Sequence, residues 1–234
     1  MQMNTKKVTA IFMKQVKDTF KNKEVLIQFM MFPVIATIMQ NSIHIDDMPR
    51  NYFVILFATM YIGMSPLTSM AAILAEEKEK NTLRVLLMSN VKASEYLFGV
   101  GSYIFLICML GSLVFAVVGQ YRGTEFIVFL FIMALGIFIS MLIGAGIGTL
   151  SKNQMSATSV TVIVMMIFAF LPMISMFNKV IAKVSRFTFS QQLNDLMNEI
   201  GTISLKIDSI VILLVNMIIA LFIFVLAYRR CKLA

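Results

Sequence analysis

The sequence has little charge and few of the residues that build polar active sites. Of its 234 residues, 14% are charged, one is histidine, two are cysteine and none is tryptophan. A soluble domain carries roughly 25% charged residues, whereas this chain is 59% hydrophobic and has a mean hydropathy of +0.86. So little polar surface excludes a soluble enzyme or a nucleic-acid-binding domain.

Further absences limit the kinds of protein that this chain can be. No GxxxxGK[ST] segment occurs, so the chain has no P-loop to bind ATP phosphates. Cys108 and Cys231 fall in an apolar stretch and in a basic tail, so no disulfide between them is expected. The single histidine, His44, fits a solvated loop residue better than a ligand. A cleavable signal peptide is not expected, because the first apolar run begins only near Val25.

Six segments contain no Asp, Glu, Lys or Arg, and each is long enough to cross ~30 Å of hydrocarbon. We therefore predict an all-α membrane protein, a single transmembrane domain over residues 1–234. The predicted spans are 25–45, 51–75, 96–121, 126–151, 153–178 and 209–228. None of them holds a charged side chain that a proton- or ion-coupled carrier would use as a relay.

The basic residues predict the orientation. Both termini, the loop between the second and third spans and the loop between the fourth and fifth spans hold 14 of the 20 Lys and Arg residues. The other loops hold 6. Because loops on the cytoplasmic side are richer in Lys and Arg, we predict that both termini are cytoplasmic. The basic residues that give the net charge of +8 are therefore explained by membrane orientation, and they do not indicate a phosphate-binding face. Four tyrosines lie at span edges, where amphipathic rings are expected: Tyr52, Tyr96, Tyr121 and Tyr228.

Residues 5–23 are too polar to span a membrane but have helical periodicity. One arc of the helix is mainly apolar and consists of Val8, Ile11, Phe12, Val16, Thr19 and Phe20. The opposite arc carries Lys6, Lys7, Lys14, Lys17 and Lys21. We predict an amphipathic helix in the cytoplasmic headgroup layer, with its lysines toward anionic lipid. It acts either as a membrane anchor or as a contact helix for a cytoplasmic partner.

Three other patterns concern packing. Small residues recur every fourth position at Gly136, Ser140, Gly144 and Gly148, which predicts close helix packing within the chain or between subunits. Pro33, Pro66 and Pro172 predict kinks inside their spans. The external segment 179–208 has helical spacing at its apolar residues, so we expect one or two short helices on the outer membrane surface.

The loop between the second and third spans is the most informative segment. Leu83, Leu86 and Leu87 share a helical face, and Glu76 and Lys80 form a favourable i, i+4 pair. A simple connection does not need an apolar stripe. The stripe therefore predicts a short helix that docks on another part of this chain or on a partner.

This loop resembles that of the permease subunits of ABC-2 type ATP-binding-cassette transporters, where the pattern is similar to E-x-E-x-G-T-L-E-x-L-x-x-S-P followed by E-Y-L-x-G. The matching residues are Glu77, Glu79, Thr82, Leu83, Leu86, Ser89, Glu95, Tyr96, Leu97 and Gly99. The chain departs at Asn81, Arg84, Asn90 and Val100, where the family has Gly, Glu, Pro and often Lys. Asparagine tolerates left-handed backbone, so Asn81 is a mild change; Asn90 leaves open how sharply the chain turns.

The resemblance implies a coupling helix that docks on a separate ATPase, which would bind ATP and Mg²⁺ while this chain holds no cofactor or metal. The implied contacts are Glu76, Glu77, Glu79, Asn81, Thr82, Leu83, Arg84, Leu86 and Leu87, with a second turn at Ser151, Lys152, Asn153 and Gln154. It also implies a second permease chain, surrounding membrane lipid, a bacterial cell membrane and re-entrant external helices, but no nucleic acid.

Permeases this short resemble bacterial exporters of amphipathic peptides or drugs, including the phenol-soluble modulin exporter type. The spans offer no fixed charge, and the 21 methionines provide an adaptable apolar surface, which suits amphipathic or lipid-like cargo.

Two other classes of membrane protein share some of these features. A self-sufficient channel or facilitator is compatible with charge-free spans, although no ring of polar residues resembles an ion filter. An intramembrane protease fits less well. Glu76-Glu77 is similar to the start of an E-E-x-x-x-R motif, but Asn81 stands at the arginine position, and one histidine is too few for a zinc site.

Overall fold

The chain folds into a bundle of helices in the computed structural model, which describes residues 4–21, 23–43, 49–200 and 207–230. No strand occurs among these residues. The expectations for His44, Ile45, Lys206, Cys231 and Lys232 fall outside them. The helices are α1 (Thr5–Lys21), α2 (Lys23–Ser42), α3 (Tyr52–Glu79), α4 (Thr82–Met88), α5 (Ala93–Val118), α6 (Thr124–Leu150), α7 (Gln154–Ser175), α8 (Lys179–Ser185), α9 (Phe189–Asn198) and α10 (Ile207–Arg230).

Five helices are long and apolar enough to cross a membrane: α3, α5, α6, α7 and the Asp208–Arg230 part of α10. The number becomes six if α1 and α2, which are bent by 70° against each other, form one broken span. The all-helical, multi-pass architecture expected from the sequence is confirmed at this level. Helix α3 continues to Glu79, about one turn past the expected end of its span, because charged residues can extend a helix beyond the apolar layer.

Helix α3 forms the centre of the bundle. It contacts α2, α5, α6, α7 and α9. Its most apolar stretch is 78% buried, compared with 22% for α7 and 17% for α10. A helix that is apolar all round must face either protein or lipid. The surroundings of α3 are therefore protein, and most of α7 and α10 is left for lipid or another chain.

The small-residue face of α6 packs on α3 inside this chain. A Cβ on Gly144 would lie 2.3 Å from the carbonyl oxygen of Leu67, and one on Gly148 would lie 2.7 Å from that of Ala71. Ser140 is fully buried between these glycines and Gly136. Only glycine allows the two helix backbones to approach this closely. Packing within one chain is thus one role that this face performs.

The 179–208 segment contains two short helices, as expected, but one of them does not rest on a membrane surface. Phe189 and Leu193 of α9 are fully buried, and Met197 is 2% exposed. Helix α9 contacts α3, α6, α7 and α10. Its apolar side chains recur with helical spacing on one face, and that face is inserted into the end of the bundle. The surface prediction is therefore wrong for α9.

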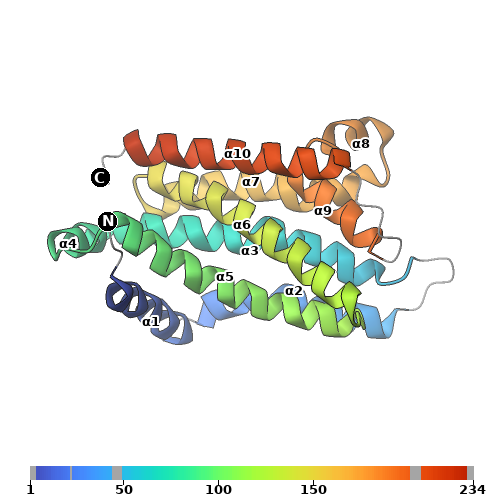
Figure 1. Ribbon diagram of the computed structural model, residues 1–234, viewed down its shortest axis with the longest axis horizontal. Coiled ribbons are helices and arrows are strands. Elements are labelled where there is room, and N and C mark those ends of the chain that lie inside the picture. Colours follow the sequence, from blue (N-terminus) through green and yellow to red (C-terminus); the bar gives the residue numbers. More distant parts are fainter. Residues whose placement is uncertain (1–3, 22, 44–48, 201–206, 231–234) are drawn as a thin grey trace.

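The two ends of the bundle differ in what they carry. Helix α4 projects from one end, where α1 begins and α10 ends, whereas α8 and α9 lie at the other end (Figure 1). This arrangement puts the beginning and end of the described chain on the same side. The assignment of that side to the cytoplasm remains a prediction from the Lys and Arg distribution.

Replacing Gly144 with alanine is expected to destabilise the bundle. The added methyl would clash with the Leu67 carbonyl, and overpacking of this kind costs about 1–3 kcal/mol, more than the ~1 kcal/mol that alanine contributes to helix propensity. We expect the Tm of purified Gly144→Ala protein in detergent to fall by about 3 °C.

The matched control is Gly101→Ala in α5. Its new Cβ would lie 3.4 Å from the flexible Cε of Met141, so the Tm should stay the same or rise. Equal Tm values for the two variants would contradict the close contact between α3 and α6.

Candidate functional site

The α3–α4 corner turns at a left-handed asparagine. Asn81 has φ 55° and ψ 11°, and its amide donates to the carbonyl oxygen of Lys78 at 3.1 Å. Glycine adopts this backbone conformation most readily, and asparagine is among the few other residues that tolerate it. The expectation that asparagine can replace the family's glycine agrees with this geometry.

Helix α4 ends in a second left-handed asparagine. Asn90 has φ 62°, and the amide of Val91 donates to the carbonyl oxygen of Leu86 at 3.2 Å, as in a Schellman cap. Proline, whose φ is fixed near −65°, could not adopt this conformation. The turn after α4 is therefore made differently from the family's proline-containing turn, and it is a tight one.

The two faces of α4 have different surroundings. Leu83 is 4% exposed and Leu86 packs against the core, so these leucines dock on their own chain; the side chain of Leu87 lies outside what the structure describes. The outer face presents Arg84 together with two apolar side chains, Val85 and Met88, which are 64% and 79% exposed. Sequence reasoning missed Val85 and Met88, although their i, i+3 spacing marks a second face.

Glu77 links three segments at this end of the bundle. Its side chain is 6% exposed and forms an ion pair with Lys14 of α1. Gln15 donates to the same carboxylate at 3.2 Å, and the Thr82 hydroxyl donates to it at 2.8 Å. A buried carboxylate is stable only when its oxygens are paired in this way. Glu77 and Thr82 thus fix α4 and α1 to the end of α3, and the Glu77 carboxylate faces inward.

The next two residues of α3 bind the α6–α7 turn. The Lys78 ammonium donates to the carbonyl oxygens of Thr149 and Ser151 at 2.6 and 2.7 Å. This cation occupies the end of α6, where carbonyl groups are left without partners within the helix. The Glu79 carboxylate accepts from the amide of Gln154 at the start of α7, at 2.8 Å.

The two predicted ATPase contacts, α4 and the turn 151–154, therefore lie beside the same stretch of α3. Ser151 is buried, whereas Lys152, Asn153 and Gln154 are exposed. Asn153 caps α7 by accepting from the amide of Ser156 at 2.9 Å. Lys152 is the only charged residue of this turn, and its exposure leaves it accessible from outside the chain.

Glu76 and Lys80 form the expected surface pair. Glu76 accepts a hydrogen bond from Lys80, which raises the pKa of Lys80 above its ordinary value. An exposed i, i+4 pair of this kind contributes little to stability, because solvent screens its charges.

Helix α1 packs on α5 rather than only on lipid. Ile11 is 5% exposed and approaches Gly99 so closely that a Cβ there would lie 2.8 Å away. Phe12 meets Tyr103 edge to face, and the hydroxyls of Thr19 and Tyr103 form a hydrogen bond. The buried face runs through Ile11, Gln15 and Thr19.

Phe20, which periodicity places on the apolar arc, is 75% exposed, which is compatible with a side chain that faces lipid. One expectation for α1 changes, and it concerns the lysines. Lys7 donates to the carbonyl oxygen of Asn90 and Lys14 pairs with Glu77, so both lysines face the α3–α5 segment instead of anionic lipid. Lys6, Lys17 and Lys21 are exposed, and Val16 packs against the core. The pattern of apolar residues does not reveal that polar Gln15 belongs to the protein-facing side.

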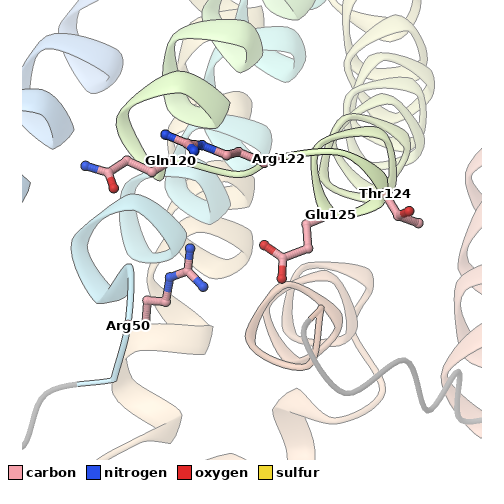
Figure 2. A pocket seen from close by; sticks show the side chains of 5 residues that line it. All are labelled: Arg50, Gln120, Arg122, Thr124 and Glu125. Atoms are coloured by element: carbon pink, nitrogen blue, oxygen red, sulfur yellow. The ribbon is translucent and has the colours of Figure 1, made fainter.

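The opposite end of the bundle carries an open polar hollow of about 630 Å³, lined by Arg50, Gln120, Arg122, Thr124 and Glu125. Figure 2 shows that these side chains come from the two connections before α3 and α6 and from the first turn of α6. No group of three or more His, Cys, Asp or Glu residues that could hold a metal ion occurs within the described ranges.

Comparison with curated proteins gives no match. The family model described as ABC-2 family transporter protein matches residues 3–229, which includes α1, the α3–α4 corner and every candidate span up to the last turn of α10. Because the match covers nearly the whole chain, the protein belongs to the ABC-2 transporter family and is a membrane component of an ABC transporter.

Proposed function

We propose that the chain is the membrane-spanning subunit of an exporter driven by a separate ATPase, which docks on α4 and on the turn 151–154. The observation that carries this proposal is that α4 is buried on one face and exposed on the other. Its inner face is anchored by Leu83, and its outer face leaves Val85 and Met88 exposed next to Arg84. An exposed apolar patch rimmed by polar residues is typical of a protein-binding surface.

The α4 end would then be cytoplasmic, because ATP is bound and hydrolysed there. This agrees with the excess of Lys and Arg predicted for that side. ATP and Mg²⁺ would belong to the partner ATPase. A bacterial plasma membrane and a second permease chain, identical or paralogous, complete the proposed assembly.

The connections of α3 suggest how movement of the ATPase would reach the spans. Glu77, Lys78 and Glu79 bond to α1, to the end of α6 and to the start of α7. A push on α4 is therefore transmitted to three helices at once rather than absorbed by a loose loop. Rearrangement of these helices would open a path for apolar or amphipathic cargo.

Amphipathic or hydrophobic cargo is proposed because the candidate spans expose apolar side chains, such as Ile163 of α7 and Phe222 of α10. A self-sufficient channel or facilitator is the second candidate, and it requires no docking surface on α4. The two candidates differ in whether α4 has a partner.

The double variant Val85→Asp/Met88→Asp is expected to abolish ATPase docking. Both side chains are exposed, so the fold should be retained, whereas two carboxylates in an apolar contact would cost several kcal/mol of binding energy. The measurement is purification of the tagged permease from its native host, with the P-loop ATPase subunit identified and quantified by mass spectrometry. We expect a stoichiometric ATPase with the native chain and at least a tenfold loss with the variant.

The matched control is Val180→Asp/Val184→Asp on α8, at the other end of the bundle, where the two side chains are 72% and 63% exposed. This variant should retain the ATPase. If the native protein and both variants purify without an ATPase and still transport substrate, the docking proposal is wrong and the facilitator hypothesis replaces it.

Glu77→Ala is expected to destabilise the protein by about 1–3 kcal/mol, because Gln15 and Thr82 lose their buried acceptor and Lys14 loses its counter-ion. Glu76→Ala is the control and should change stability little, because its pair with Lys80 is exposed. Thermal unfolding of the purified variants in detergent measures both. A Glu77 variant as stable as the Glu76 variant would show that the carboxylate does not hold this end together.

A further inference from the structure

Helix α1 is held on the bundle in one orientation. Its inner face runs through Ile11, Gln15 and Thr19 and packs on α5. Gln15 donates to the Glu77 carboxylate of α3, and Thr19 forms a hydrogen bond with Tyr103 of α5. A helix that is anchored by polar bonds to two neighbours cannot roll about its own axis. The side chains on its outer side therefore keep fixed places.

The outer side of α1 divides into an apolar strip and a basic strip. The apolar strip consists of Met13 and Phe20, which are 46% and 75% exposed and lie within ~20° of each other around the helix. The basic strip consists of Lys6, Lys17 and Lys21, which are exposed, lie within ~60° of one another and adjoin the apolar strip. Helices on membrane surfaces have this arrangement, with apolar side chains toward the acyl chains and lysines at the headgroups.

The basic strip keeps its positive charge. Two ion pairs occur among the described residues, and neither includes a lysine of the strip. Asp18 is the only acidic residue of α1, and it lies close enough to Lys80 of the α3–α4 corner for their charges to attract. Three lysines outnumber one carboxylate even if Asp18 is counted against them. The next two charged residues of the chain, Lys23 and Glu24, cancel each other in this count.

Helix α1 lies where the apolar layer begins. It is at the end of the bundle that carries α4, beside the first part of α5 (Figure 1). Ile11 approaches Gly99, and Phe12 meets Tyr103. These contacts place α1 next to the first turns of a candidate span that starts at Ala93. The phospholipid headgroups of one leaflet are at this level and meet the outer side of α1.

We propose that the outer side of α1 is a binding surface that selects anionic phospholipids in the leaflet at the α4 end. The phosphate groups bind the basic strip, and the acyl chains pack against the apolar strip. Lysines near a membrane surface attract anionic headgroups, whereas zwitterionic lipid gives the surface no net charge to attract them. Binding requires neither the ATPase nor a cargo, so failure of this proposal leaves docking at α4 untouched.

The absence of tryptophan from the chain allows a direct test. A Phe20→Trp variant carries a single fluorophore beside the basic strip. The purified variant is reconstituted into vesicles of phosphatidylcholine with a fixed minority of phosphatidylglycerol. In one set the phosphatidylglycerol has brominated chains, and in the other an equal amount of the phosphatidylcholine has them. Bromine quenches tryptophan on contact, so the ratio of quenching between the sets measures which lipid surrounds the fluorophore.

We expect brominated phosphatidylglycerol to quench Phe20→Trp about threefold more strongly than brominated phosphatidylcholine. Adding Lys6→Gln, Lys17→Gln and Lys21→Gln to the same chain should bring the ratio to about one, because the basic strip is then neutral. The ratio should also fall at roughly 1 M NaCl, where charges are screened beyond ~3 Å. All three substitutions change exposed side chains, so an unchanged Tm verifies folding.

Two controls separate this surface from the rest of the bilayer and from net charge. Leu110→Trp places the fluorophore on α5, at a side chain that is 63% exposed and has no charged residue within ten positions. Both lipids should quench it equally. Lys179→Gln with Lys183→Gln removes two exposed charges from α8, at the other end of the bundle. This pair should leave the ratio measured with Phe20→Trp unchanged.

Two results would overturn the proposal. Equal quenching of Phe20→Trp by the two lipids would mean that α1 contacts lipid without selecting its charge. No quenching of Phe20→Trp by either lipid, with normal quenching of Leu110→Trp, would mean that the outer side of α1 lies in water and is open to a soluble partner instead.

Discussion

The buried carboxylate of Glu77 is the interaction on which the α4 end of the molecule depends. It pairs with Lys14 and accepts from Gln15 and Thr82, so α1, α3 and α4 meet at one charged group with little access to water. Lys78 and Glu79 continue the connection to α6 and α7. These three consecutive residues of α3 fix the relative position of four other helices, α1, α4, α6 and α7. If an ATPase docks on α4, as proposed, its movement would enter the bundle through this rigid connection.

Most of the fold can be predicted from the sequence because a helix that crosses a bilayer must be long and apolar. Charge-free segments predicted the long helices, and the small-residue repeat of α6 predicted a face of close packing, which the structure places against Leu67 and Ala71. The limits of this reasoning appear at α1 and α9. Periodicity identified amphipathic helices but could not say whether an apolar face meets lipid or protein. Leu193 and Phe189 are buried by tertiary packing that a single helix pattern does not contain.

The sequence predicts where the candidate site lies, but it does not predict which face of α4 is exposed to a partner. The leucine stripe marked α4 as a docking helix, and the structure uses Leu83 to dock α4 on its own chain. The residues that remain for a partner, Val85 and Met88, are only two, and they form a weaker pattern than the three leucines. The sequence therefore does not single them out. Glu77 shows the same limitation. A charged residue in a loop motif suggests a surface contact, and only the placement of Lys14 and Gln15 reveals an inward-facing carboxylate.

Helix α4 has only seven residues, and a left-handed asparagine bounds it on each side, at Asn81 and Asn90. Connecting loops commonly accept insertions and deletions. Here a residue added or removed between Leu83 and Val85 would rotate Val85 and Met88 by about 100° relative to the buried Leu83. Val85 and Met88 would then no longer lie on the face that the structure leaves exposed. The corner should therefore vary in side chains while keeping a fixed length, and a change in length rather than in composition would mark relatives that have exchanged one ATPase for another.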